Sequence, residues 1–364
     1  MKSINWWQTT LKDAEIEAVV HAMRDRRIGM GPLVVAFESE ICKALDVPYA
    51  LMCPSGSVAL YMALMVHGIG PGDEVIVPNR TFIATAHAAR LTGARVVLVD
   101  CNAQNTNINV DLIEEKITPK TRAIMPVHLN GRAVSMDALT PLARRHRLIV
   151  VEDACQALFS QTQGKPLGTL SHVGCFSLGI AKLLTTGIGG FAVCHDQKTW
   201  EQLARFRNHG VSDLNHLDYQ SLGFNFKVSD MTAAAGRVQL ARREQRAAHV
   251  TRIYHTYVTE LAGIDGITPI SVNTQGGEIP IYAEFRSPRR DALLAWLEGQ
   301  GIAQHLLPPG LHLSAHLEND GLFPNSDGFD REAFILPCGP DQPLENIHVV
   351  VEKVKEFFAG QFMK

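Results

Sequence analysis

The feature that most constrains the fold is a regular alternation between helical patterns and short apolar runs, which begins near residue 35. The segment "SVALYMALMVHGIGPGDEV" predicts a helix closed by Gly68 and a Gly-Pro-Gly turn, followed by a strand at Glu74–Pro78. Further apolar runs follow helical patterns at Arg95–Asp100, Arg122–Val127 and Leu148–Asp153. They are rich in Val and Ile and lack polar alternation, which is typical of a parallel sheet with helices on both faces. We therefore predict an α/β fold.

The pattern changes after about residue 200. The alternating part includes a helical pattern over residues 110–118 and two more strand candidates, at 174–178 and 190–195. Beyond it come charged helical patterns, a region of glycine and proline turns, and a last run of helix, strand and helix. We predict a large domain over residues 1–240, including the N-terminal segment, and a smaller α+β domain over residues 241–364.

Composition argues against several classes of partner. Lys plus Arg number 34 and Asp plus Glu 37, without a run of like charge, so we expect neither nucleic acid nor a membrane surface as a partner. We find no stretch of eighteen apolar residues and no secretory pattern at the N-terminus. The seven cysteines are scattered, with no CxxC pair, which favours a reducing compartment. These features predict a cytoplasmic protein.

Two candidate site segments follow predicted strands or open helices, where ligands bind in open α/β sheets. The turn "PSGSVAL" places Gly56 and Ser57 at a helix start, where free N–H groups could hold a phosphate, although Ser55 could equally be a simple N-cap. Asp153 ends a predicted buried strand, where a carboxylate needs a cation or a donor. Gln156 would face the same side if a helical turn begins there, and Asp153 would then be a helix cap instead.

Lys182 lies in the apolar stretch "SLGIAKLLTTGIGG". Lysine is rarely fully buried, so its ammonium either reaches water or occupies a functional pocket. In a pocket, desolvation would lower the lysine pKa and make the neutral amine available for Schiff-base chemistry. Thr185 and Thr186 could hydrogen-bond the turn that follows.

Other polar residues carry weaker signals. Asn225 and Lys227 lie in "LGFNFKVSD", which by itself indicates only a loop. His312, His316 and Asp320 are spaced by four residues, but their segment is short and rich in turns, so we predict no metal site. Contact with substrate, or a plain surface helix, is the preferred interpretation for these histidines.

Taken in order, the motifs resemble the DegT/DnrJ/EryC1/StrS family of sugar aminotransferases, which are pyridoxal-phosphate enzymes. The resemblance covers nearly the whole chain and weakens beyond about residue 250. The blocks that carry it include "RRIGMGPLVVAFESE", "PSGSVALYMAL", "GPGDEVIVPNRTFIATAHA", "AIMPVHLNG", "VEDACQA", "TTGIGG", "RNHG" and "GFNFKVSDMTAAAGRVQL". The family has the aspartate-aminotransferase fold (type I), which implies a mainly parallel seven-stranded sheet in the large domain.

The resemblance also implies roles for individual residues. Lys182 would form the Schiff base with pyridoxal 5′-phosphate, and Asp153 would keep the pyridine nitrogen protonated. Gln156 would lie near the ring hydroxyl and Phe82 would stack on the ring face. The residues that would bind the phosphate are Gly56, Ser57, Ser177 and, from the neighbouring subunit, Asn225. A homodimer with shared active sites is therefore implied, and Lys227, His305 and His312 are candidate substrate residues.

The implied reaction transfers an amino group from glutamate, or possibly glutamine, to a keto-sugar that is usually nucleotide-linked. Both half-reactions would use one site, which implies ping-pong kinetics. Relatives that act as dehydratases replace the lysine with histidine, so Lys182 favours aminotransfer. The alternatives are an aminotransferase for a cyclitol or free keto-sugar, and a non-catalytic regulatory relative.

The chain departs from the family pattern at four positions. Leu178 stands where an aromatic is usual, and Ala181 where threonine is frequent. Ile188 replaces the glutamate of "GEGG", and Lys227 replaces an arginine. These departures leave the implied cofactor residues intact and concern the substrate.

Overall fold

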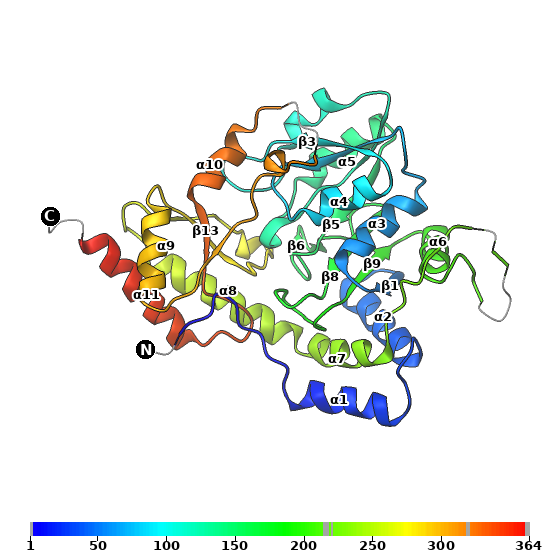
Figure 1. Cartoon of the computed structure of the whole chain (residues 1–364), viewed down its shortest axis with the longest axis horizontal. Helices are drawn as coiled ribbons and strands as arrows, with labels where there is room; N and C mark the ends of the chain where they lie inside the picture. The colour runs from blue at the N-terminus through cyan, green and yellow to red at the C-terminus, as the bar shows by residue number, and fades with distance from the viewer. Residues whose placement is uncertain (1–2, 214–217, 220, 318–320, 361–364) are drawn as a thin grey trace.

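A seven-stranded sheet forms the centre of the computed structural model, which describes residues 3–213, 218–219, 221–317 and 321–360 (Figure 1). Its strand order is β1-β9-β8-β5-β4-β2-β3, and among these strands only β9 runs against its neighbours. The strands are β1 (Tyr49–Cys53), β2 (Glu74–Pro78), β3 (Arg95–Val99), β4 (Thr121–Ile124), β5 (Ile149–Asp153), β8 (Val173–Ser177) and β9 (Gly190–Cys194). The prediction of a mainly parallel seven-stranded sheet is confirmed.

Helices cover both faces of this sheet because successive strand residues point to opposite sides. One core cluster joins alternate strand residues such as Val75 and Val151 to α3, α4 and α6. The opposite residues, such as Ile76 and Met52, pack against α2, α5 and α7. These helices are α2 (Pro32–Leu45), α3 (Gly56–Val66), α4 (Ala84–Leu91), α5 (Met136–Arg145), α6 (Gln197–Arg207) and α7 (Asp230–Ala241). Helix α1 (Asp13–Arg24) packs on the outside of α7.

The helical pattern predicted over residues 110–118 is wrong as an α-helix. The structure has two short 3₁₀ turns there, η1 (Val110–Leu112) and η2 (Glu114–Lys116). The Asn109 side chain accepts a bond from the Asp111 N–H, and Ile113 between the turns is fully buried. Short 3₁₀ turns are common connectors where a chain must bring one apolar side chain into the core within a few residues.

A smaller antiparallel sheet, with the order β10-β11-β13-β12, lies in the C-terminal part. Its strands are β10 (Thr268–Pro269), β11 (Ala283–Arg286), β12 (His305–Leu306) and β13 (Ala333–Leu336). Its core includes residues of α8 (Arg243–Glu260), α9 (Arg290–Gly299) and α11 (Leu344–Ala359). The remaining elements are β6 (Gln161–Thr162), β7 (Lys165–Pro166), η3 (Leu129–Gly131), η4 (Thr274–Gly276), η5 (Leu311–Leu313) and α10 (Pro324–Glu332).

The N-terminal segment lies against this C-terminal part, so the two ends of the chain are on the same side of the molecule (Figure 1). Ile4 belongs to the C-terminal core and pairs with Ile302, while Trp7 pairs with Cys338.

The predicted domain boundary near residue 240 falls between the end of α7 and the start of α8, and we keep it as a proposal. In the part of the chain that the structure describes, no helix is both long and apolar enough to cross a membrane.

Candidate active site

A cavity of about 350 Å³ lies at the carboxyl ends of β5 and β8 and collects most of the predicted site residues. It is bounded by the large sheet on one side and by the N-terminal segment and the small sheet on the other. The predicted residues that line it are Gly56, Ser57, Phe82, Asp153, Gln156, Ser177, Lys182 and His305. Other lining residues that sequence reasoning did not single out include Trp6, Cys155 and Tyr282.

The N-terminus of α3 opens into this cavity. Ser55 has an extended backbone and its Oγ accepts from the Val58 N–H at 3.2 Å, so it is the N-cap that the alternative interpretation foresaw. Among the described residues, the N–H groups of Gly56 and Ser57 have no protein acceptor. A Cβ on Gly56 would lie 2.5 Å from Cys155 Sγ, so only glycine fits this approach. The turn is therefore both a helix cap and a site suited to an anion.

Asp153 is held by neutral donors. Its Oδ2 accepts from the Thr85 hydroxyl at 2.8 Å, and its Oδ1 accepts from the Cys155 N–H at 3.1 Å. The Thr85 hydroxyl is also 2.8 Å from that of Thr81. No helix begins after Asp153, so it is not a helix cap, although Gln156 lines the same cavity. The buried carboxylate therefore has hydrogen bonds without a cationic side chain in direct contact, which suits it to hold a protonated ring nitrogen.

Lys182 lies near acidic groups that its sequence neighbours did not indicate. Burial alone would lower its pKa, but Tyr282, Cys155 and Asp153 together hold the pKa of this lysine above its ordinary value. The predicted lowering of the pKa is therefore wrong for the chain without its cofactor. Sequence shows the apolar neighbours of a lysine, whereas its opposing charges come from distant segments.

The loop that carries Lys182 is fixed on two sides. On the inside, the Thr186 N–H donates to the Leu178 carbonyl at 2.9 Å, and the Gly187 N–H donates to Thr185 Oγ1 at 2.9 Å. This confirms the prediction that the two threonines hydrogen-bond the turn, and Gly187 has the positive φ, 81°, that glycine tolerates.

On the outer side, side chains from two distant segments bind two successive carbonyls of the loop. Trp7 Nε1 donates to the Ile180 carbonyl at 2.9 Å, and the Tyr282 hydroxyl donates to the Ala181 carbonyl at 2.8 Å. The carbonyls that precede Lys182 are thus bound by groups from the N-terminal segment and from the start of β11.

Three predicted residues do not line the cavity of their own chain. Asn225 is exposed and pairs through its backbone with Asn208, whose side-chain oxygen accepts from Lys227 Nζ at 3.4 Å. Asn225 and Lys227 both lie in the connection between α6 and α7, and neither lines the cavity. His312 lies on η5, outside the cavity.

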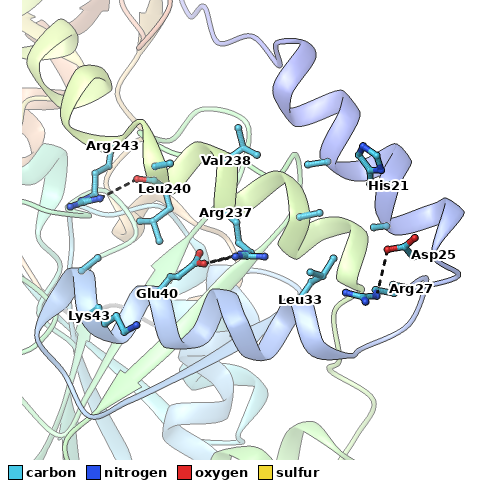
Figure 2. Close-up of a pocket in the computed structure, with 15 residues that line it drawn as sticks. His21, Asp25, Arg27, Leu33, Glu40, Lys43, Arg237, Val238, Leu240 and Arg243 are labelled. Carbon is cyan, nitrogen blue, oxygen red and sulfur yellow. Dashed lines mark hydrogen bonds and ion pairs between the residues drawn. The ribbon is translucent and has the colours of Figure 1, made fainter.

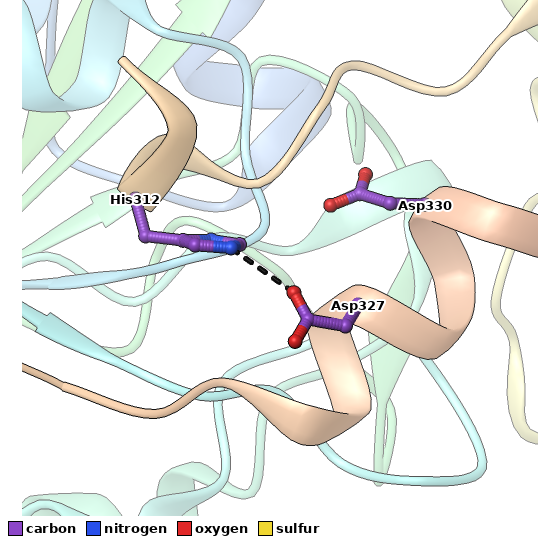
Figure 3. Close-up of side chains that lie close together, drawn as sticks. All are labelled: His312, Asp327 and Asp330. Atoms are coloured by element: carbon purple, nitrogen blue, oxygen red, sulfur yellow. Dashed lines mark ion pairs between the residues drawn. The ribbon is translucent and has the colours of Figure 1, made fainter. Parts of the chain in front are cut away.

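His312 forms a cluster with Asp327 and Asp330 of α10 (Figure 3). Its Nε2 is 3.0 Å from Asp327, and its Nδ1 is 2.8 Å from the side-chain nitrogen of Asn79. Asp330 accepts from Arg80 and from the Gly310 N–H. The nitrogen and oxygen atoms that could hold a metal ion here are bonded to protein groups instead. The cluster therefore joins η5 and α10 to the end of β2.

His312 and His316 do not share a helix. His316 lies beyond η5 and pairs through Nε2 with His87 Nε2 at 2.8 Å. Asp320, the third residue of the spacing considered above, lies outside the described residues.

A larger cavity, of about 700 Å³, lies elsewhere, between α1, α2 and α7 (Figure 2). Across it, Arg237 Nε of α7 donates to Glu40 of α2 at 2.9 Å. None of the predicted site residues lines it. Size alone does not locate chemistry, so we place the candidate active site in the smaller cavity, which combines a lysine, a carboxylate and a free helix N-terminus.

The residues around the smaller cavity fit pyridoxal phosphate. The glycine approach at Gly56 and the free N–H groups suit its phosphate, and Asp153 suits its ring nitrogen. Lys182 supplies the amine, and the ring of Phe82 is 58% exposed at the cavity, where it can cover a flat ligand.

Comparisons with known proteins agree with this donor set. The profile of the DegT/DnrJ/EryC1/StrS aminotransferase family matches residues 9–355. The dTDP-3-amino-3,4,6-trideoxy-alpha-D-glucose transaminase of Streptomyces venezuelae is 35% identical over 94% of this chain and 92% of that protein. The GDP-perosamine synthase of Caulobacter vibrioides is 35% identical over 78% of this chain and 80% of that protein.

The architecture agrees as well. The crystal structure of DesV from S. venezuelae superposes with a TM-score of 0.93 at 32% identity, covering 98% of this chain and 99% of that one. The chain belongs to the DegT/DnrJ/EryC1/StrS aminotransferase family and is a pyridoxal-phosphate-dependent aminotransferase.

Proposed function

We propose that this aminotransferase moves an amino group from glutamate, or glutamine, to a nucleotide-linked keto-sugar. The observation that carries the proposal is the cavity in which Lys182, Asp153 and the N-terminus of α3 converge. The names of the two relatives, both of which make nucleotide-linked amino sugars, support the substrate class.

Each cofactor residue expected in the cavity has a proposed task. Gly56, Ser57 and Ser177 bind the cofactor phosphate, and Phe82 covers the ring while Gln156 lies beside its hydroxyl. Asp153 holds the ring nitrogen in its protonated form through the carboxylate that Thr85 orients. Bound there, pyridoxal phosphate supplies an electron sink that makes the α-proton of the donor acidic. Lys182 Nζ carries that proton between the α-carbon of the donor and the C4′ carbon of the cofactor.

The same groups serve both halves of the reaction. The donor would enter, leave its amino group with the bound cofactor and depart as an oxo-acid, and the keto-sugar would then enter the same cavity to receive that group. Lys182 therefore works in both directions, and we expect ping-pong kinetics.

We further propose a homodimer in which Asn225 of each chain completes the phosphate site of the other. Asn225 and Lys227 do not reach their own cavity, which supports a role in a neighbouring one. Large apolar side chains are exposed on the lysine loop and on the α6–α7 connection, among them Ile180 at 66%, Ile188 at 76% and Phe224 at 64%. Exposed apolar side chains of this size favour burial against a second subunit. Ile188 stands where the family usually has a carboxylate, so this surface is more apolar here.

Two other functions remain as alternatives. A cyclitol or free keto-sugar would use the same residues, and only the acceptor would differ. A non-catalytic regulatory role is disfavoured because Lys182, Asp153 and Gln156 share the cavity. We keep a cytoplasmic location as a prediction, consistent with the seven cysteines, all of which are free thiols.

The test uses the visible absorbance of the purified protein with pyridoxal phosphate. A band of lysine-bound cofactor should disappear on adding glutamate or glutamine and return on adding the keto-sugar. Because transamination is reversible, GDP-perosamine and dTDP-3-amino-3,4,6-trideoxy-alpha-D-glucose should bleach the band in the reverse direction if either is accepted. A protein that shows no band with added cofactor would refute the proposal, and bleaching by an aminocyclitol alone would favour the first alternative.

A further inference from the structure

We infer that Trp6 and His305 form a sugar-binding wall, on which the C–H face and the hydroxyl groups of the keto-sugar ring are held. The inference rests on the proposed function and names the part of the cavity that recognises its acceptor. Both residues line the cavity that contains Lys182, and neither is among the residues proposed to bind the cofactor. We call this pair the aromatic wall.

The backbone of Trp6 is fixed by the C-terminal part of the chain. The Cys338 N–H donates to the Trp6 carbonyl at 2.8 Å. Two residues earlier, the Ile4 N–H donates to the Gly301 carbonyl at 3.0 Å, and the Ala303 N–H donates to the Ile4 carbonyl at 2.8 Å. A binding group fixed in advance loses little entropy when its ligand arrives, which is what recognition of a small sugar requires.

The rings of the wall face each other closely. The centroids of Trp6 and His305 are 4.5 Å apart at an interplanar angle of 26°, so the two rings are stacked. A nucleobase cannot enter between rings at this distance, so a ligand can meet only the outer faces and the polar edges of the pair. Flat aromatic faces suit the apolar C–H face of a sugar ring, and their polar tips suit its hydroxyl groups.

The polar atoms of the wall are still free to bind a ligand. The neighbouring Trp7 and Tyr282 donate to carbonyls of the lysine loop, as described above. By contrast, within residues 3–213, 218–219, 221–317 and 321–360 no hydrogen-bond partner is found for Trp6 Nε1 or for either ring nitrogen of His305. The wall therefore holds one indole donor and an imidazole that are not engaged with the protein.

The charge around the wall favours a neutral ligand group. Partial burial against its neighbours lowers the pKa of the His305 imidazole, so the neutral ring predominates at neutral pH and offers one donor and one acceptor. Of the described residues that line the cavity, Lys182 and Asp153 are the ones with charged side chains, and both have tasks on the cofactor. A wall without net charge fits the hydroxyl groups of a sugar better than a phosphate or a carboxylate, each of which would seek a cation.

The test measures the two half-reactions of the holoenzyme separately, with glutamate and with whichever amino sugar bleaches the wild-type band. Trp6→Ala should lower kcat/KM for the amino sugar about tenfold, because it removes both the flat face and the donor. Trp6→Phe keeps a ring but loses the N–H, and we expect a loss of about threefold. Both variants should keep the absorbance band and the glutamate half-reaction within about twofold of wild type.

A matched control and three contrary outcomes make the test decisive. Trp296→Phe makes the same change on α9, outside the cavity, and should alter neither half-reaction. An equal loss of both half-reactions in Trp6→Ala would mean that Trp6 only supports the lysine loop, and no loss in either would also overturn the inference. Weaker inhibition by the free nucleoside diphosphate of the probe in Trp6→Ala would assign the wall to the base instead. If wild-type protein reacts with glutamate but with no sugar, the proposed function itself fails.

Discussion

The polar groups on the two sides of the active-site cavity differ in how fully they are hydrogen-bonded to the protein. On the sheet side, Thr85, Asp153 and the Ser55 cap are bonded to one another or to nearby backbone before any ligand arrives. On the opposite side, the aromatic wall of Trp6 and His305 is positioned by backbone bonds, and its polar atoms are left free. The cofactor stays in place from one turnover to the next, which favours side chains that are already hydrogen-bonded in position. Substrates must enter and leave, which favours polar atoms that are free to bind them. In our proposal, the difference separates residues that perform chemistry from residues that select the acceptor.

The largest effect should come from Lys182→Ala. In the proposed mechanism, the variant loses the amine that binds the cofactor and the group that moves the proton, so we expect kcat to fall about 10⁴-fold and the visible band to vanish. Steady-state turnover and an absorbance spectrum check this. Lys165→Ala, on the exposed strand β7, is the matched control and should retain both. Retention of the band in Lys182→Ala would remove this lysine from the proposed role.

A smaller but still large loss is expected for Asp153→Asn. The amide preserves the size of the side chain but removes the negative charge opposite the ring nitrogen, which should lower kcat about 10²- to 10³-fold. Single-turnover bleaching with glutamate measures the loss. Because Asp153 belongs to the sheet side, both half-reactions should slow alike, and a defect confined to the sugar half-reaction would contradict the division between the two sides.

Thr85→Val should have an intermediate effect. It removes the hydroxyl that donates to Asp153 Oδ2 and leaves a buried carboxylate oxygen short of one donor, which predicts a loss of about tenfold in kcat/KM for both substrates. Thr85→Ser restores the hydroxyl and should recover most of that loss. If serine fails to rescue, the effect comes from packing rather than from the hydrogen bond.

The smallest expected effect concerns pH and the aromatic wall. Burial lowers the pKa of folded His305, so as pH falls through about 6.5 the unfolded chain takes up a proton before the folded chain does. The stability contributed by neutral His305 is therefore present above that pH and lost below it. Melting temperatures at pH 7.5 and 5.5 should fall less for His305→Gln than for wild type. Equal falls would show that the imidazole is not the responsible group.

Sequence patterns predicted the sheet side well and the wall hardly at all. Runs of Val and Ile marked the strands, and ligand residues follow strand ends, so Asp153 and the turn at Gly56 could be found. Thr85 was missed because its partner Asp153 is 68 residues away. The bonds that Trp7 and Tyr282 make to the lysine loop span 173 and 101 residues. A local sequence pattern cannot predict contacts at such separations, because these contacts depend on how the two sheets pack together.

The attachment of the N-terminal segment also sets an order of events during synthesis. Ile4 and Trp6 bond through their backbones to residues 301, 303 and 338, so these partners exist only after residue 338 has been made. Contacts between such distant segments form late in folding. The large sheet can therefore form while Trp7 and the lysine loop are still apart, and the backbone bonds that position Trp6 form only after residue 338 has been made. A ribosome-bound fragment ending before residue 301 would lack the aromatic wall.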